Sequence, residues 1–339
     1  MAAQTDMNGL RSAWRALSGS GGGEGWKTIP IATSAPCMLL AGRHLPGDEE
    51  ALLVGFRNVH TPPDSHLPQG HGFEVSRLSS APTGGDRFWV ALARRTGGSP
   101  EFFAMMAEDL LRLIEGGRTQ EEGQLLHRFL SRIRAWQDFM DRHREGVLSS
   151  EAELGLFGEL VILDHMITAG MPERQAVDSW QGPLDGLQDF MPGGGGIEVK
   201  ATLSAGGFPA TISSLEQLDE SLRQPLFLAA VRLGLDSSGM TLPAKADAIC
   251  TRLGGNPAAF ELFDVRLMQA GLLRTMAECY TRRFLTVSTV VLPVQDAFPR
   301  LTRAHVHPAI RKARYEIDLD LAGASGIDLA RALELLGAI

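Results

Sequence analysis

Cysteine is scarce in this chain of 339 residues, which contains only Cys37, Cys250 and Cys279. The three are far apart and form no Cys-x-x-Cys spacing, so the sequence favours neither a disulfide framework nor a structural zinc site. Long apolar runs are also missing, since no stretch approaches the roughly 20 residues of a membrane-spanning helix. The first residues, MAAQTDMNGLRSAW, lack a basic segment followed by an apolar one. We therefore expect a cytoplasmic protein with no signal peptide and no membrane partner.

Basic residues are in the minority, with 32 lysines and arginines against 40 aspartates and glutamates and a net charge of −8. This balance argues against a surface coated in basic residues for bulk nucleic-acid binding, but it leaves room for a local basic groove. Hydrophobic residues make up 44% and charged residues 21%, which are ordinary values for a globular protein. The length allows two domains, or one large domain with an extension.

Short segments of β-forming residues, separated by Gly, Pro and Asp, dominate residues 1–100. We interpret this part as a mostly β N-terminal unit, and its role stays open between reading DNA, binding a partner and mediating dimer contacts. Apolar residues at helical spacing then predict two connecting helices in residues 101–148. Residues 149–339 form a third part, which contains the motifs that suggest a catalytic site.

Helices and strands alternate in residues 149–339, and their order predicts an α/β domain with a mixed sheet flanked by helices. The first helix begins at Ser150, with Glu153 at the spacing of a capping box. It is apolar almost all the way round, so we expect it in the centre of the domain. The next elements are predicted as a strand, a second strand and a helix: Gly186–Met191, Ile197–Leu203 and Ser213–Leu222.

Two carboxylates and a lysine meet in the hairpin that these two strands would form. Side chains alternate along a strand, so Glu198 and Lys200 point to the same side. The glycines of Gly193–Gly196 can turn tightly enough to bring Asp189 beside them. Adjacent carboxylates repel each other, and a hard divalent cation such as Mg²⁺ removes that cost. Lys200 could then orient or deprotonate a water and stabilise charge on a phosphate. The alternative is an exposed Glu–Lys pair, with Asp189 as a turn residue.

Glu159 is a lone carboxylate in the apolar first helix. Its neighbours three and four positions away are a glycine and three aliphatic residues. An ionised and unpaired carboxylate among them would be costly, so Glu159 needs Lys200, a metal-bound water or another donor. We therefore expect Glu159 to point toward the same centre as Asp189 and Glu198.

Four short motifs carry a family resemblance: GLFGEL at 155–160, WQGP at 180–183, QDF at 188–190 and IEVKATL at 197–203. Together they resemble the PD-(D/E)XK nuclease superfamily over residues 150–235, and within it the bacterial "PD-(D/E)XK motif" proteins. The resemblance implies a restriction-endonuclease-like fold and a DNA endonuclease that depends on Mg²⁺, for which Mn²⁺ can substitute. It also implies a role in restriction or phage defence.

By position, the resemblance assigns roles to four residues. Asp189 and Glu198 would bind the metal, Lys200 would act on the nucleophilic water, and Glu159 would complete the metal site through a water. A homodimer and protein partners from a restriction or defence system are further expectations. The alternative function is a catalytically silent subunit that binds DNA or a partner protein with the same fold.

The motif region departs from the superfamily pattern at one position, and it leaves open which aspartate is the first metal-binding carboxylate. Gln188 stands where the motif name has Pro, and Asp185 is a rival to Asp189 as the first carboxylate. Thr202 follows the Glu-x-Lys triplet and is a candidate donor to a substrate phosphate. Gln217, on the next predicted helix, is expected to face solvent.

A basic segment near the C-terminus, RLTRAHVHPAIRKAR at 300–314, contains no acid. We interpret it as a phosphate-tracking surface beside the site, with a solvated loop as the equal alternative. Its histidines, His305 and His307, are expected to be loop residues rather than metal ligands. The candidate substrate contacts in it are Arg311, Lys312 and Arg314.

Overall fold

The computed structural model describes residues 7–19, 24–31, 35–57, 59, 62–70, 72–78, 81–83, 85–142, 147–184, 186–295 and 297–339. The chain divides into two compact units, Met1–Arg142 and His143–Ile339. All three cysteines are free, as their spacing predicted. Among the described residues, no helix is both long enough and apolar enough to cross a membrane.

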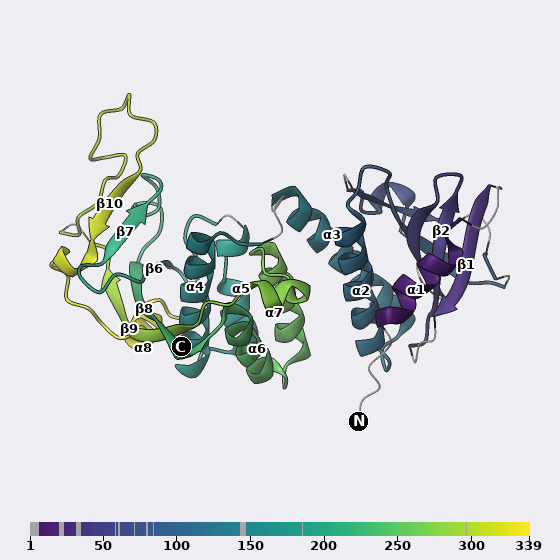
Figure 1. Ribbon diagram of the computed structural model, residues 1–339. Helices are drawn as coiled ribbons and strands as arrows, with labels where there is room; N and C mark the ends of the chain where they lie inside the picture. The colour runs from purple at the N-terminus through teal and green to yellow at the C-terminus, as the bar shows by residue number, and fades with distance from the viewer. Residues whose placement is uncertain are drawn as a thin grey trace. The chain divides into compact units, whose positions relative to one another are not determined.

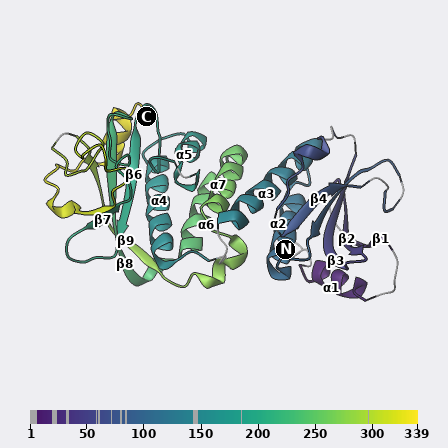
Figure 2. The same cartoon turned by 90° about the horizontal axis from the view of Figure 1, so that it is seen from above.

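The first unit is built on a five-stranded antiparallel sheet of order β1-β2-β3-β5-β4 (Figures 1 and 2). The helices that were expected to connect two domains, α2 and α3, fall within this unit. The strands are β1 (Gly25–Ile31), β2 (Met38–Leu45), β3 (Glu49–Phe56), β4 (Phe73–Arg77) and β5 (Phe88–Arg94). The helices are α1 (Met7–Leu17), α2 (Pro100–Gly116) and α3 (Glu122–Arg142).

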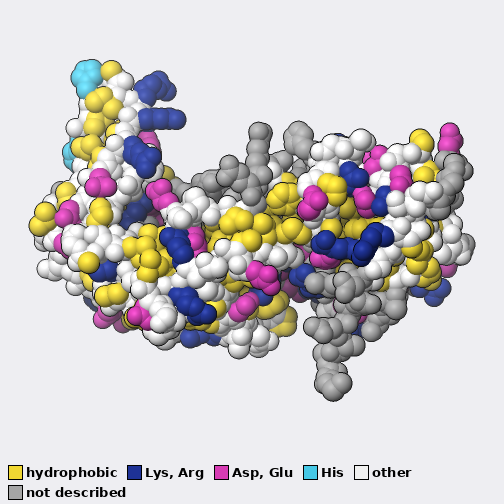
Figure 3. Space-filling view, viewed as in Figure 1, with side chains coloured by type: hydrophobic (Ala, Val, Ile, Leu, Met, Phe, Trp, Pro, Cys, Tyr) yellow, Lys and Arg dark blue, Asp and Glu magenta, His cyan; other side chains and the backbone are white. Residues whose placement is uncertain are grey.

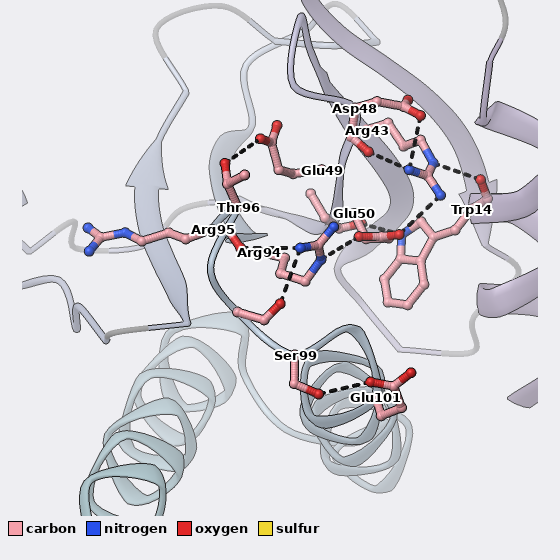
Figure 4. A network of polar contacts seen from close by, with 12 residues as sticks. Trp14, Arg43, Asp48, Glu49, Glu50, Arg94, Arg95, Thr96, Ser99 and Glu101 are labelled. Atoms are coloured by element: carbon pink, nitrogen blue, oxygen red, sulfur yellow. Dashed lines mark hydrogen bonds and ion pairs between the residues drawn. The ribbon is translucent and has the colours of Figure 1, made fainter.

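Partly buried ion pairs and hydrogen bonds hold this sheet and α1 together (Figure 4). Glu50 on β3 accepts hydrogen bonds from Arg43 at 3.1 Å and from Arg94 at 2.6 Å. Arg43 also donates to the backbone oxygen of Trp14 on α1, and the Trp14 indole donates to the backbone oxygen of Ala51, both at 2.8 Å. The arginines and Glu50 thus satisfy one another, and the network serves to fix α1 on the sheet.

The second unit centres on a three-stranded mixed sheet of order β6-β8-β9. Strand β6 (Gly196–Thr202) runs parallel to β8 (Leu226–Met240), and β9 (Phe284–Pro293) runs antiparallel to β8. One face packs against helices in the main core, and the other face packs against β7 (Pro209–Ile212) and β10 (Tyr315–Asp318). The helices are α4 (Ser150–Thr168), α5 (Glu173–Ser179), α6 (Leu242–Leu253), α7 (Pro257–Gln269) and α8 (Leu329–Leu335). This arrangement confirms the expected α/β class, with a mixed sheet flanked by helices.

Two elements predicted around the motifs were wrong. Gly186–Met191 is not a strand, because only Phe190 forms isolated bridges, to Trp180 and to Ile197. Ser213–Leu222 is not a helix but a series of turns. There the side chain of Gln217 accepts the Ser213 N–H at 2.7 Å. Such side-chain bonds to the backbone compete with helix formation.

The start of α4 also differs from its prediction. Ser149, not Ser150, is the N-cap, and its hydroxyl accepts the N–H of Ala152 at 3.2 Å. Glu153 forms an ion pair with Arg282 at 2.7 Å and does not close a capping box. The prediction that α4 is buried is correct, because its apolar side chains form much of the main core.

Candidate functional site

Gly158 sets how closely α4 approaches β6. A Cβ at Gly158 would lie 2.8 Å from the Cβ of Ala201, nearer than such atoms come in proteins. Only glycine therefore lets the helix lie this near the strand. The next residue on α4, Glu159, is brought to the outer edge of β6 as a result.

The two faces of β6 have opposite character, as the alternation of its side chains requires. Val199 packs in the main core on the side of α4. Glu198 and Lys200 point to the other face, where their partners in register on β8 are Leu228 and Ala230. The Lys200 ammonium donates to Glu198 Oε1 at 2.7 Å. Glu198 and Lys200 therefore lie on the same side of the strand, as predicted, and they are not the exposed pair of the alternative, since Glu198 is only 2% exposed.

Asp189 lies along the outer edge of β6. Its Oδ2 accepts the backbone N–H of Val199 at 2.7 Å, a bond that a neighbouring strand would otherwise supply. A Cβ added to Gly182 would lie 2.5 Å from Glu159 Oε2 and 3.2 Å from Asp189 Oδ1. The carboxylates of Glu159 and Asp189 therefore border the same small space beside Gly182. Asp185 lies outside the described residues and stays an open rival.

The three carboxylates of Glu159, Asp189 and Glu198 form the acidic site, and Lys200 is the cation beside them. Burial, followed by the charge of Asp189, raises the pKa of Glu159 well above its ordinary value. Burial and Asp189 raise the pKa of Glu198 to about 8, against the opposing effect of Lys200. Burial also raises the pKa of Asp189. Burial alone would lower the pKa of Lys200, but the carboxylates, led by Glu198, raise it. The acidic site thus has more negative charge than its lysine compensates.

The carboxylates of the acidic site fit a hard divalent cation whose coordination shell is completed by water or substrate. Among the described residues, no group of three or more His, Cys, Asp or Glu side chains is placed so that it could hold a metal ion, so at most two of these carboxylates would bind the cation directly. One oxygen of Asp189 and one of Glu198 are already hydrogen-bonded within the protein. Magnesium commonly uses one or two carboxylates and completes its shell with water and phosphate oxygens. Glu159 and Asp189 are half-buried rather than sealed off, so solvent reaches the acidic site.

Two further side chains contact the acidic site and were not predicted to do so. The Trp180 indole donates to Glu159 Oε2 at 2.7 Å. Gln217 is not turned to solvent, as was expected, but donates from Nε2 to Glu198 Oε1 at 3.1 Å. The WQGP motif contained the only sequence signal for the first contact. The contact between Gln217 and Glu198 depends on a loop, and the sequence pattern had predicted a helix there.

The predicted substrate contacts lie on two different elements. Thr202 ends β6, is buried, and accepts the N–H of Ser204 on its hydroxyl oxygen at 3.1 Å. The basic segment lies on the loop between β9 and β10, which projects from the second unit in Figure 1, and Figure 3 shows Lys, Arg and His side chains gathered along it. We call residues 299–314 the basic arm. Its exposed lysine and arginine side chains are Arg303 and the three predicted contacts, Arg311, Lys312 and Arg314.

Two ion pairs attach the base of the basic arm to the loop that contains Gln217. Arg300 pairs with Glu220 and Arg303 pairs with Glu216, each at 2.7 Å. Glu216 directly precedes Gln217, whose amide reaches Glu198. The base of the basic arm is therefore held by the same loop that contacts the acidic site. His305 lies 3.2 Å from the hydroxyl of Thr302, as a loop histidine would.

The electrostatics of the acidic site predict that Glu159→Gln stabilises the metal-free protein. A carboxyl whose pKa is raised by folding loses stability as pH rises through that range, so wild type carries this cost at neutral pH. We expect an increase in unfolding free energy on the order of 1 kcal/mol at pH 8, measured by denaturant titration in EDTA. The gain should shrink at pH 5, where Glu159 is more protonated. A variant that is less stable than wild type at pH 8 would contradict this account.

Comparison with known proteins gave one match. A family model with the description "Putative PD-(D/E)XK family member, (DUF4420)" matches residues 10–320. None of the curated proteins and none of the solved structures matched the chain. The matched range contains Glu159, Asp189, Glu198 and Lys200. It also covers the first unit from residue 10 onward.

Proposed function

Because the chain belongs to this PD-(D/E)XK family, we propose that it is a Mg²⁺-dependent endonuclease that hydrolyses phosphodiester bonds in DNA. The observation that carries the proposal is the proximity of three carboxylates and one lysine at β6, close enough for their charges to shift one another's pKa values. Nucleases of this group generally use divalent metals, and a purely structural role gives no reason to crowd acids whose pKa values are raised. A role in restriction or phage defence, with a homodimer or partner proteins, is part of the proposal and rests on the resemblance alone.

Each residue of the acidic site has a distinct task in this proposal. Asp189 and Glu198 would hold Mg²⁺ or Mn²⁺, and Glu159 would hold it through a water. Such a cation polarises a phosphoryl oxygen and makes water a better nucleophile. Lys200, fixed by Glu198 at 2.7 Å, would orient the attacking water and stabilise the charge that develops on the phosphate.

The basic arm supports DNA as the substrate. It has exposed cations in a chain of net charge −8, and its base is attached to the loop that reaches Glu198. A DNA backbone that follows Arg311, Lys312 and Arg314 would therefore approach the acidic site. Thr202, at the end of β6, would add a hydrogen bond to phosphate.

Cleavage assays with different DNA forms test the proposed function directly. Supercoiled plasmid, linear duplex, branched and single-stranded DNA would each be incubated with Mg²⁺, Mn²⁺, Ca²⁺ or EDTA. We expect cleavage of at least one DNA form in Mg²⁺ or Mn²⁺ and none in EDTA. DNA that is retained by the protein but cut in no metal would favour the silent binding subunit and overturn the enzyme proposal.

Neutralising the basic arm should weaken DNA binding in a salt-dependent way. The triple variant Arg311→Gln, Lys312→Gln, Arg314→Gln removes three proposed phosphate contacts, so the slope of log K against log salt should fall by about 3. Fluorescence anisotropy with labelled duplex in Ca²⁺ would measure it. Arg331→Gln, which removes an exposed cation from α8, is the control and should keep the wild-type slope. An unchanged slope in the triple variant would exclude the basic arm from the DNA-binding surface.

A further inference from the structure

Trp180 links the aromatic core to the acidic site. It follows α5, is completely buried, and its ring lies near those of Phe190 and Phe263, with centroids 6.5 and 5.9 Å away. These neighbours fix the plane of the indole. The N–H therefore points in one direction, and the acceptor in that direction is Glu159.

The bond between Trp180 and Glu159 acts against the repulsion within the acidic site. Glu159 Oε2, which accepts the indole N–H at 2.7 Å, is also the oxygen nearest to the space beside Gly182 that Asp189 borders. Repulsion from Asp189 favours movement of the Glu159 side chain away from this space. A hydrogen bond from a rigid donor to an ionised carboxylate is strong enough to resist that movement.

We propose that Trp180 is a positioning residue, which holds the Glu159 carboxylate beside Asp189 so that both can serve a divalent cation. The inference rests on the proposed function for the identity of the cation. Donors that orient metal-ligating groups from outside the ligand shell commonly change metal affinity by about 10–100-fold when they are removed. Trp180 has the geometry of such a donor, since its indole N–H donates to Glu159 and the indole offers no lone pair that could bind a cation.

Tryptophan fluorescence can report this contact, because Trp180 is the only tryptophan of the second unit. The other four, at positions 14, 26, 89 and 136, belong to the first unit. A cation that binds at Glu159 changes the charge next to the Trp180 indole. The emission of Trp180 should therefore change with Mg²⁺ concentration, and subtracting the Trp180→Phe spectrum isolates that change.

The test is Trp180→Phe, which keeps an aromatic ring between Phe190 and Phe263 but removes the donor. We expect Mn²⁺ to bind about tenfold more weakly, as measured by calorimetry without DNA. Trp136→Phe is the matched control, because the Trp136 indole also donates to a buried carboxylate, that of Asp109 at 2.8 Å, in the first unit. This control should bind Mn²⁺ as wild type does.

A double-mutant cycle separates positioning from a general effect on the fold. In a Glu159→Gln background, Trp180→Phe should weaken Mn²⁺ binding little further, because the carboxylate that it positions is gone. Glu159→Gln with Trp180 intact should also lose the Mg²⁺-dependent emission change, and this result is available even if Trp180→Phe does not fold. Three results would each overturn the inference. The first is equal Mn²⁺ affinity in wild type and Trp180→Phe, and the second is the same tenfold loss of affinity in both backgrounds. The third is a Mg²⁺-dependent emission change that survives Glu159→Gln.

The two proposals can fail separately. Metal binding and emission are measured without DNA, so a wild-type protein that binds Mn²⁺ but cuts no DNA would overturn the nuclease while Trp180 kept its role. Divalent-dependent cleavage by wild type, together with unchanged Mn²⁺ binding in Trp180→Phe, would support the nuclease and overturn the positioning role of Trp180.

Discussion

Glu198→Gln and Lys200→Ala should each reduce divalent-dependent DNA cleavage by about a thousandfold or more. Glu198 is a proposed ligand for the cation, and it also accepts the hydrogen bond that fixes Lys200. Glu198, Asp189 and Glu159 all raise the pKa of the Lys200 ammonium group, so its charge is coupled to all three carboxylates. Neither role can be taken over by a neighbouring side chain of the acidic site.

The two variants should differ in metal binding and stability, which tells their roles apart. Glu198→Gln removes a proposed ligand, so Mn²⁺ affinity should fall. Lys200→Ala leaves the carboxylates without their compensating charge, so the metal-free protein should lose about 3 kcal/mol of stability and recover it when Mg²⁺ binds. Thermal unfolding with and without Mg²⁺, beside a plasmid-cleavage assay, measures both effects.

Lys245→Ala is a matched control for Lys200→Ala. Lys245 pairs with Asp164 at 2.6 Å, and its side chain is about as buried as that of Lys200, but it contacts none of the acidic site. The control should lose stability without losing its cleavage rate per folded molecule. Full cleavage by both Glu198→Gln and Lys200→Ala would show that any nuclease activity comes from another part of the protein.

Local physical chemistry was enough to predict most of the acidic site. Alternation along β6 placed Glu198 and Lys200 on one face, whatever surrounds the strand. The cost of burying Glu159 required a polar centre near it, and the structure has Asp189 there. Asp189 lies along β6 although the strand predicted around it does not form, because the bridge between Phe190 and Ile197 holds residue 189 beside β6.

The remaining contacts could not be predicted because they depend on tertiary structure. The direction of the Trp180 indole is set by Phe190 and by Phe263, and Phe263 lies far along the sequence on another helix. Gln217 reaches Glu198 only because its own side chain binds the Ser213 N–H and thereby stabilises a turn where a helix was expected. Neither contact produces a repeating pattern of apolar and polar residues, so the sequence alone gives no sign of it.

Gly182→Ala should lower cleavage by about a hundredfold while costing little stability. The backbone of Gly182 is not in the left-handed region, so alanine fits its conformation. Its Cβ, however, would lie 2.5 Å from Glu159 Oε2, and that oxygen must move. The displaced group is the end of a side chain, so the fold can absorb the change. A displacement of about 1 Å in a catalytic group can nevertheless cost a hundredfold in rate.

Gly155→Ala is the matched control, because a Cβ at that position on α4 meets no atom within 4 Å. It should leave cleavage unchanged and stabilise the helix by about 0.5–1 kcal/mol, since alanine replaces glycine inside a helix. Steady-state cleavage rates and Mn²⁺ affinities of the two variants make the comparison. If Gly182→Ala cleaved DNA and bound Mn²⁺ as Gly155→Ala does, the space beside Glu159 and Asp189 would not be the place where the cation binds.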